Sequence, residues 1–82
     1  MLLKFSPHGR RRMQERAIAE SDILFTLREH NRVRYPSREG GGKWVYEGRN
    51  ASGRRLAIIT RPAVEDLPPG GRLTIITAYW RD

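Results

Sequence analysis

The chain is 82 residues long and strongly basic, with 16 Lys and Arg against 9 Asp and Glu and a formal net charge of +7. This length predicts a single domain over residues 1–82 and leaves no room for a separate cofactor domain. The absence of cysteine excludes disulfides and thiolate zinc sites, and two histidines are too few for a structural metal site. No apolar run approaches the roughly 20 residues that span a bilayer, so we expect a cytoplasmic protein without a membrane segment.

The positive charge is carried almost entirely by arginine, which accounts for 14 of the 16 basic residues. Arginine binds phosphate through two parallel hydrogen bonds, and solubility alone does not require such an excess over lysine. The composition therefore favours a polyanionic partner, such as a nucleic acid. The alternative explanation is a high-GC genome, which enriches arginine in every protein that it encodes.

The first third of the chain predicts two helices, at about 7–17 and 20–30. Ser6 is a good N-cap, and Pro7 occupies the first helical position, where its missing N–H costs nothing. The second helix is predicted from two acidic residues in its first turn and from an apolar face at helical spacing. Ala19 is a poor N-cap, so the start of this helix is less sharply marked.

After residue 31 the apolar spacing changes to the alternation that is typical of strands. The run from Pro62 to Gly71 contains three prolines and is expected to be a loop. The predicted strands lie at about 32–36, 43–50, 54–61 and 73–81. The expected fold class is therefore α+β, with two N-terminal helices packed on a three- to four-stranded antiparallel sheet in two layers.

Alternation assigns the residues of each predicted strand to two faces. In the last strand, Leu73, Ile75, Thr77 and Tyr79 are expected on one face, and Thr74, Ile76, Ala78 and Trp80 on the other. We expect one face of the sheet to pack on the helices. The other face is expected to present arginines and aromatic residues to a ligand.

The start of the first predicted helix concentrates positive charge. His8, Arg12 and Arg16 lie at i, i+4 and i+8, which places them on one stripe. Arg10, Arg11 and Arg12 crowd a helix end that already carries about half a positive charge. A bound anion would reverse this repulsion, so the segment predicts a phosphate site with His8 as a candidate general base. The alternative is a basic surface helix that solvent and one neighbouring glutamate screen.

Aromatic and basic residues are interleaved on the predicted strands. Tyr46 and Tyr79 lie near Arg49, Arg61 and Arg81. Such a mixture suits single-stranded nucleic acid, whose bases stack on aromatic rings while arginines hold the phosphates. The two tryptophans are explained at least as well by an ordinary core.

The run of three glycines before Lys43 does not match a phosphate-binding loop. Trp44 stands where that pattern needs Ser or Thr, and Ser37 stands where it needs its first glycine. We expect a hairpin loop in which Lys43 and Arg38 are available to the backbone of a nucleic acid.

Taken in order along the chain, these motifs resemble a known family. A histidine-led helix is followed by the pattern R-M-x-x-R-x-I and by the acidic start of a second helix; the matching residues are His8, Arg12, Met13, Arg16, Ile18 and Glu20 to Ile23. Three downstream segments follow in matching order: 45–49, 53–58 and 75–79. The chain is similar to the family called domain of unknown function 4258, which is grouped with RelE-like toxins in the barnase–EndoU–colicin–RelE fold.

The resemblance implies a RelE-like two-layer architecture and a metal-independent bacterial endoribonuclease that needs no cofactor. Cleavage by such an enzyme proceeds by attack of the ribose 2′-hydroxyl and leaves a cyclic phosphate. The resemblance implies that His8 transfers a proton and that Arg12, Arg16 and Arg49 bind and neutralise the phosphate. It also implies that Thr77 and Tyr79 supply hydrogen bonds from the last strand. The implied partners are RNA, including ribosome-associated mRNA, and an acidic antitoxin or immunity protein.

Two other functions stay open on the sequence. A non-catalytic nucleic-acid-binding module would show steeply salt-dependent binding and no cleavage products. A scaffold protein would use its basic face to meet an acidic protein partner. A DNA-reading helix-turn-helix is disfavoured, because no third helix precedes the strands.

Overall fold

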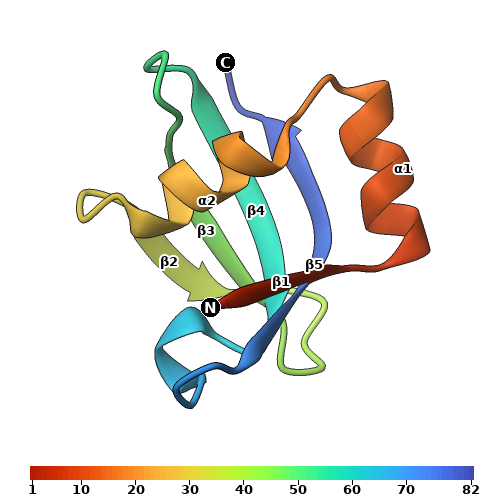
Figure 1. Ribbon diagram of the computed structural model, residues 1–82, viewed down its shortest axis with the longest axis vertical. Helices are drawn as coiled ribbons and strands as arrows, with labels where there is room; N and C mark the ends of the chain where they lie inside the picture. The colour runs from red at the N-terminus through yellow and green to blue at the C-terminus, as the bar shows by residue number, and fades with distance from the viewer.

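The architecture combines two helices with a five-stranded sheet (Figure 1). The computed structural model describes all 82 residues. In chain order the elements are β1 (Leu2–Phe5), α1 (Pro7–Glu15), α2 (Glu20–Arg28), β2 (Val33–Pro36), β3 (Trp44–Arg49), β4 (Arg55–Arg61), the short 3₁₀ turn η1 (Val64–Asp66) and β5 (Arg72–Trp80). The α+β class with two N-terminal helices is confirmed, and each helix ends two residues before its predicted end.

The sheet is mixed, with the strand order β1-β5-β4-β3-β2. The prediction of three to four antiparallel strands was wrong, because Leu2–Phe5 form a further strand that pairs parallel with β5. The other three pairings, β5 with β4, β4 with β3 and β3 with β2, are antiparallel. The partner of β1 lies at the opposite end of the chain, so local sequence carries no signal for this pairing.

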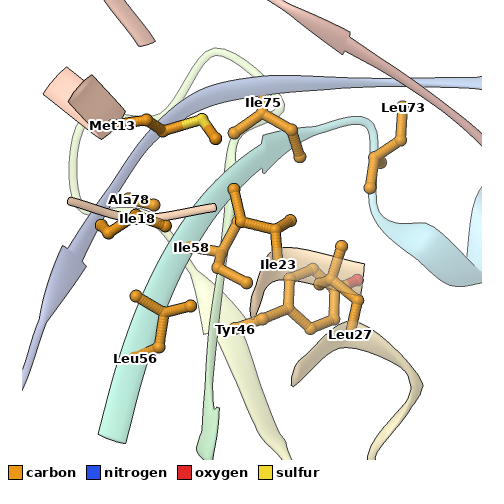
Figure 2. Close-up of a cluster of buried hydrophobic side chains, with 10 residues drawn as sticks. All are labelled: Met13, Ile18, Ile23, Leu27, Tyr46, Leu56, Ile58, Leu73, Ile75 and Ala78. Carbon is orange, nitrogen blue, oxygen red and sulfur yellow. The ribbon is translucent and has the colours of Figure 1, made fainter. Parts of the chain in front are cut away.

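The hydrophobic core lies between the helices and one side of the sheet, which we call the inner face (Figure 2). Ile23 and Leu27 are four residues apart on α2, so both point from the same side of that helix into the core. The opposite side of the sheet is called the open face. The buried cluster consists of Met13, Ile18, Ile23, Leu27, Tyr46, Leu56, Ile58, Leu73, Ile75 and Ala78.

A β-bulge divides β5 into two halves. Thr60 pairs with Ile75, whereas the preceding Ile59 pairs with Thr77, so Ile76 is an extra residue. Directly paired residues of antiparallel strands share a face, and the bulge therefore shifts the alternation by one residue. The expectation that Ile75 and Thr77 share a face was wrong for this reason: Ile75 is in the core, and Thr77 lies on the open face.

The first turn of α1 packs directly on the backbone of β5 at this bulge. Ser6 caps the helix by accepting a hydrogen bond from the Gly9 N–H at 2.9 Å, and its hydroxyl donates to the Ile76 carbonyl at 3.3 Å. A Cβ atom on Gly9 would lie 2.8 Å from the carbonyl oxygens of both Ile75 and Ile76. Only glycine permits this approach, so Gly9 fixes the position of α1 against the sheet.

Candidate nucleic-acid interface

Side chains on the open face form rows that run across the strands, because paired residues point to the same side. Neither helix covers this face of the sheet (Figure 1). One row consists of Val33, Glu47, Ala57 and Tyr79, and a second of Tyr35, Val45, Ile59 and Thr77. A third row holds the pair Arg49 and Arg55. The backbone N–H of Arg81 donates a hydrogen bond to the Arg55 carbonyl at the end of this row.

Glu47 lies near the middle of the open face and is the only acidic residue in any of the five strands. The Tyr35 hydroxyl donates to one of its carboxylate oxygens, and Arg81 Nε donates to the other at 3.1 Å. The Glu47 side chain is 15% exposed, whereas that of Arg81 is 45% exposed. Because Arg81 follows β5 and Glu47 lies on β3, the arginine side chain reaches across β4 and leaves its guanidinium over the open face.

The hydrogen bond to Glu47 is the main reason that the pKa of Tyr35 lies above its ordinary value of 10.0. Loss of water contact and the negative charge of the carboxylate act in the same direction. Tyr35 therefore keeps its proton at neutral pH and remains a donor to Glu47.

Four arginines on the open face have no acidic partner: Arg49, Arg55, Arg61 and Arg72. Arg49 donates to the Gly53 carbonyl at 2.7 Å, and the side chains of the other three make no hydrogen bond. A hollow of about 340 Å³ at the Arg49 end of the sheet is lined by Glu29, Asn31, Val33, Glu47, Gly48, Arg49 and Arg55. Guanidinium groups without a carboxylate partner keep their hydrogen-bonding capacity for a phosphate.

Lys43 and Arg61 lie at the other end of the open face. Trp44 pairs with Thr60, so the residues that flank this pair meet at the same end of β3 and β4. Neither Lys43 nor Arg61 forms an ion pair. The face thus carries positive charge at both ends, separated by the length of β4, which is about 20 Å at the usual rise of a strand.

Arg16 and Thr77 lie together at the edge of β5. Arg16 Nη1 is 3.5 Å from Thr77 Oγ1 and donates to the Ala78 carbonyl at 2.7 Å. The Arg16 carbonyl accepts a hydrogen bond of 2.7 Å from the Trp80 indole. These contacts join the end of α1 to the half of β5 that β1 does not reach, so Arg16 has a structural role in addition to any contact with RNA.

The basic start of α1 lies on the surface. His8 is exposed, and its side chain makes no hydrogen bond or ion pair. Arg10 and Arg12 form ion pairs with glutamates, at 3.5 Å to Glu20 and 3.0 Å to Glu15, whereas Arg11 has no acidic partner. Exposed pairs of this kind are weak and can exchange for a phosphate. Of the implied catalytic residues, the structure brings Arg16 to Thr77 and gives His8 no partner within the chain.

Tyr46, which was expected to stack on bases, is fully buried. Its hydroxyl donates to Glu65 at 2.6 Å and accepts a hydrogen bond of 2.7 Å from the Val64 N–H. The guanidinium of Arg32 packs over its ring at 5.0 Å from the centroid. The ring belongs to the core and is not available to RNA in this fold, so Tyr46 is left out of the interface proposed below.

Glu65 gives the protein a pH-dependent contribution to stability. Burial alone would raise its pKa, but the hydrogen bond from Tyr46 and the charges of Arg32 and Arg34 outweigh it and hold the pKa below its ordinary 4.5. This contribution is fully present above the ordinary pKa and is lost as the pH falls through the lower pKa of the folded state.

We therefore expect Glu65→Gln to lower the free energy of unfolding at neutral pH, and the difference from wild type to shrink as the solution is acidified below the ordinary pKa. Urea unfolding of both proteins across this pH range measures the difference. A difference that stays constant down to the most acidic condition would contradict the assignment.

Sequence reasoning missed Tyr35, Glu47 and Arg55 as parts of this surface. The one available signal was that Glu47 is the only acidic residue in strands that are otherwise apolar or basic. The register that brings Tyr35 beside Glu47 is set across a seven-residue loop, from 37 to 43, whose length does not reveal the pairing.

The fold and the site together define a small α+β protein whose open sheet face is basic around a single carboxylate. The chain belongs to the family described as Domain of unknown function (DUF4258), which matches residues 5–80. This match confirms the family expected from the sequence. No curated protein and no solved structure matches the chain. Neither helix is long and apolar enough to cross a membrane, and no group of three or more His, Asp or Glu side chains could hold a metal ion.

Proposed function

We propose that the protein is a toxin-like, metal-independent ribonuclease that binds single-stranded RNA along its open face. The observation that carries the proposal is the set of arginines without acidic partners, with Arg49 and Arg55 at one end of this face and Arg61 at the other. Tyr35 and Tyr79 lie between these ends. Bases stack on tyrosine rings while guanidinium groups hold phosphates, so this arrangement suits a flexible single strand.

The RelE-like architecture is part of the same proposal. In this chain α1 and α2 precede the four antiparallel strands β2 to β5, and this order supports the assignment. The implied partner is an acidic antitoxin or immunity protein that covers the open face, because surfaces of opposite charge attract and orient one another. The proposed place of action is the cytoplasm, where mRNA, including ribosome-associated mRNA, is available.

Replacing both Arg49 and Arg55 with glutamine is expected to weaken binding of a short single-stranded RNA and to reduce its salt dependence. Each phosphate contact contributes about 0.7 to the slope of log K against log salt for single strands, so the double variant loses about 1.4. Fluorescence anisotropy of a labelled oligonucleotide between about 50 and about 200 mM KCl measures this slope.

The control is Arg28→Gln, which removes from α2 an arginine that also lacks an acidic partner. Its slope should stay close to that of the wild type. A loss of about 0.7 in this variant, the same as the loss per arginine in the double variant, would mean that net charge, and not the open face, determines binding.

Cleavage is tested by incubating end-labelled RNA with the protein in the presence of EDTA. The expected products are a fragment that ends in a 2′,3′-cyclic phosphate and a fragment that begins with a 5′-hydroxyl. Salt-dependent binding without products would favour the non-catalytic nucleic-acid-binding module. Tight binding of an acidic protein that RNA does not displace would favour the scaffold function.

A further inference from the structure

We propose that Glu47 is the catalytic base of the open face and accepts the proton of the RNA 2′-hydroxyl, with Tyr35 as a positioning residue. The inference rests on the proposed ribonuclease function and names the reacting group within that surface. It differs from the role that the family resemblance implies for His8.

The first step of the argument is that Glu47 has the wrong charge for a surface that only binds RNA. A carboxylate repels phosphate, and every other charged residue in the five strands is basic. Glu47 is nevertheless held in one orientation, because Tyr35 and Arg81 each bind one of its oxygens. A fixed carboxylate beside guanidinium groups is the combination that proton abstraction next to a phosphate requires.

The second step is that the surface leaves room for a substrate beside Glu47. Glu47 lines the hollow of about 340 Å³ described above, together with Arg49 and Arg55. Ala57, the neighbour of Glu47 on β4, is fully buried, so this space lies toward the Arg49 end of the face and not over Ala57. A phosphodiester group in the hollow can lie between the carboxylate and two guanidinium groups that have no acidic partner.

The third step is that positive charge converges on this same hollow. Arg49 and Arg55 line it, and neither has an acidic partner. Arg81 binds Glu47 and still has 45% of its side chain exposed. These guanidinium groups are placed to stabilise the additional negative charge that develops on the phosphate oxygens in the transition state.

The resulting reaction is a transesterification. Glu47 takes the proton of the 2′-hydroxyl while the 2′-oxygen forms a bond to phosphorus. The bond from phosphorus to the 5′-oxygen breaks, and that oxygen takes a proton from a water molecule, which leaves a hydroxide ion. One product ends in a 2′,3′-cyclic phosphate and the other begins with a 5′-hydroxyl. Glu47 then gives its proton to the hydroxide ion, so the carboxylate and the water are both restored.

The test compares cleavage rates of wild type and Glu47→Gln at saturating RNA, together with the RNA dissociation constant. The variant is expected to lose at least about 100-fold in rate, the lower end of general base contributions. Its affinity should be unchanged or tighter, because a negative charge has left the surface. Glu47→Asp keeps a carboxylate and should retain part of the rate. Glu39→Gln, which removes an acidic residue from a loop, is the matched control and should cleave like wild type.

Tyr35→Phe tests whether Tyr35 orients the Glu47 carboxylate or only stabilises the fold. This variant is expected to lower kcat several-fold while KM stays unchanged, because the carboxylate remains but is less well oriented. A merely structural role would change the melting temperature without this split between kcat and KM. Circular dichroism shows that each variant is folded.

Cleavage by Glu47→Gln at the wild-type rate would overturn the inference and leave the proposed function intact. The same conclusion follows if His8→Ala abolishes cleavage while Glu47→Gln retains it, since the base would then be His8. Wild-type protein that fails to bind RNA, or binds RNA without cleaving it, would refute the proposed ribonuclease and the inference with it.

Discussion

Replacing Gly9 with alanine is expected to destabilise the protein by about 2 kcal/mol, the opposite sign from the same change in an exposed helix. In an exposed helix interior, alanine is more stable than glycine by about 1 kcal/mol. Here the new Cβ would lie 2.8 Å from the carbonyl oxygens of Ile75 and Ile76, so the first turn of α1 must move away from β5. Overpacking of this kind usually costs about 1–3 kcal/mol.

Urea unfolding and thermal melting measure the effect of Gly9→Ala. For a domain of this size a loss of 1 kcal/mol lowers the melting temperature by about 4–8 °C, so a fall of about 8–16 °C is expected. Gln14→Ala changes an exposed residue of the same helix and should stay within about 0.5 kcal/mol of wild type. A gain in stability for Gly9→Ala would mean that α1 does not approach β5 as closely as described.

Tyr46→Phe is expected to lower the free energy of unfolding by about 2 kcal/mol, because it removes a buried hydroxyl that makes two hydrogen bonds. One of these bonds goes to the charged Glu65, and the other satisfies the Val64 N–H. Bonds to charged groups are worth about 1.5–3 kcal/mol, and a donor left without a partner adds to the loss.

The chain offers a matched control for this change. Tyr35 also donates its hydroxyl to a glutamate, but its side chain lies on the surface with 41% of the residue exposed. Water can replace the lost bond there, so Tyr35→Phe should cost less than about 1 kcal/mol. Equal losses in the two variants would show that burial does not determine the value of these bonds.

The helices could be predicted because the signals that start them lie within a few residues. Ser6 caps α1 through the Gly9 N–H, as its position before a proline indicates. Ala19 cannot cap α2 with its own side chain, but Asp22 in the first turn accepts a hydrogen bond of 2.9 Å from the Ala19 N–H. The acidic first turn that predicted this helix therefore helps to hold its start in place.

The parts of the fold that were missed depend on residues far apart in the chain. The parallel strand β1 needs β5 as its partner, and no feature of four residues near one end predicts that pairing. The bulge at Ile76 arises from the pairing of β4 with β5. Ile75 and Thr77 pair with two consecutive residues of β4, which leaves Ile76 between them without a partner. Strict alternation, which considers one strand at a time, cannot show such a shift.

The candidate site also has parts that local sequence predicts and parts that depend on residues far apart in the chain. Arg49 and Arg61 could be predicted as surface residues, since a strand position next to a turn is usually exposed. The burial of Tyr46 and its bond to Glu65 depend on how the loop after β4 folds back, so the sequence placed this tyrosine on the wrong side. Glu47 could not be recognised, because its role depends on contacts from β2 and from the end of β5.

The bulge in β5 also determines which changes of length this strand can accept among relatives. Deleting the unpaired Ile76 would leave Ile75 opposite Thr60 and Thr77 opposite Ile59, so both halves of β5 would keep their partners and their faces. In β4, which has no extra residue, a one-residue deletion would turn every side chain on one side of the gap to the opposite face. The loop from 37 to 43 lies outside the strands and also accepts changes of length. Gaps in an alignment of relatives are therefore expected in this loop and at Ile76, where one residue can be lost without moving the core.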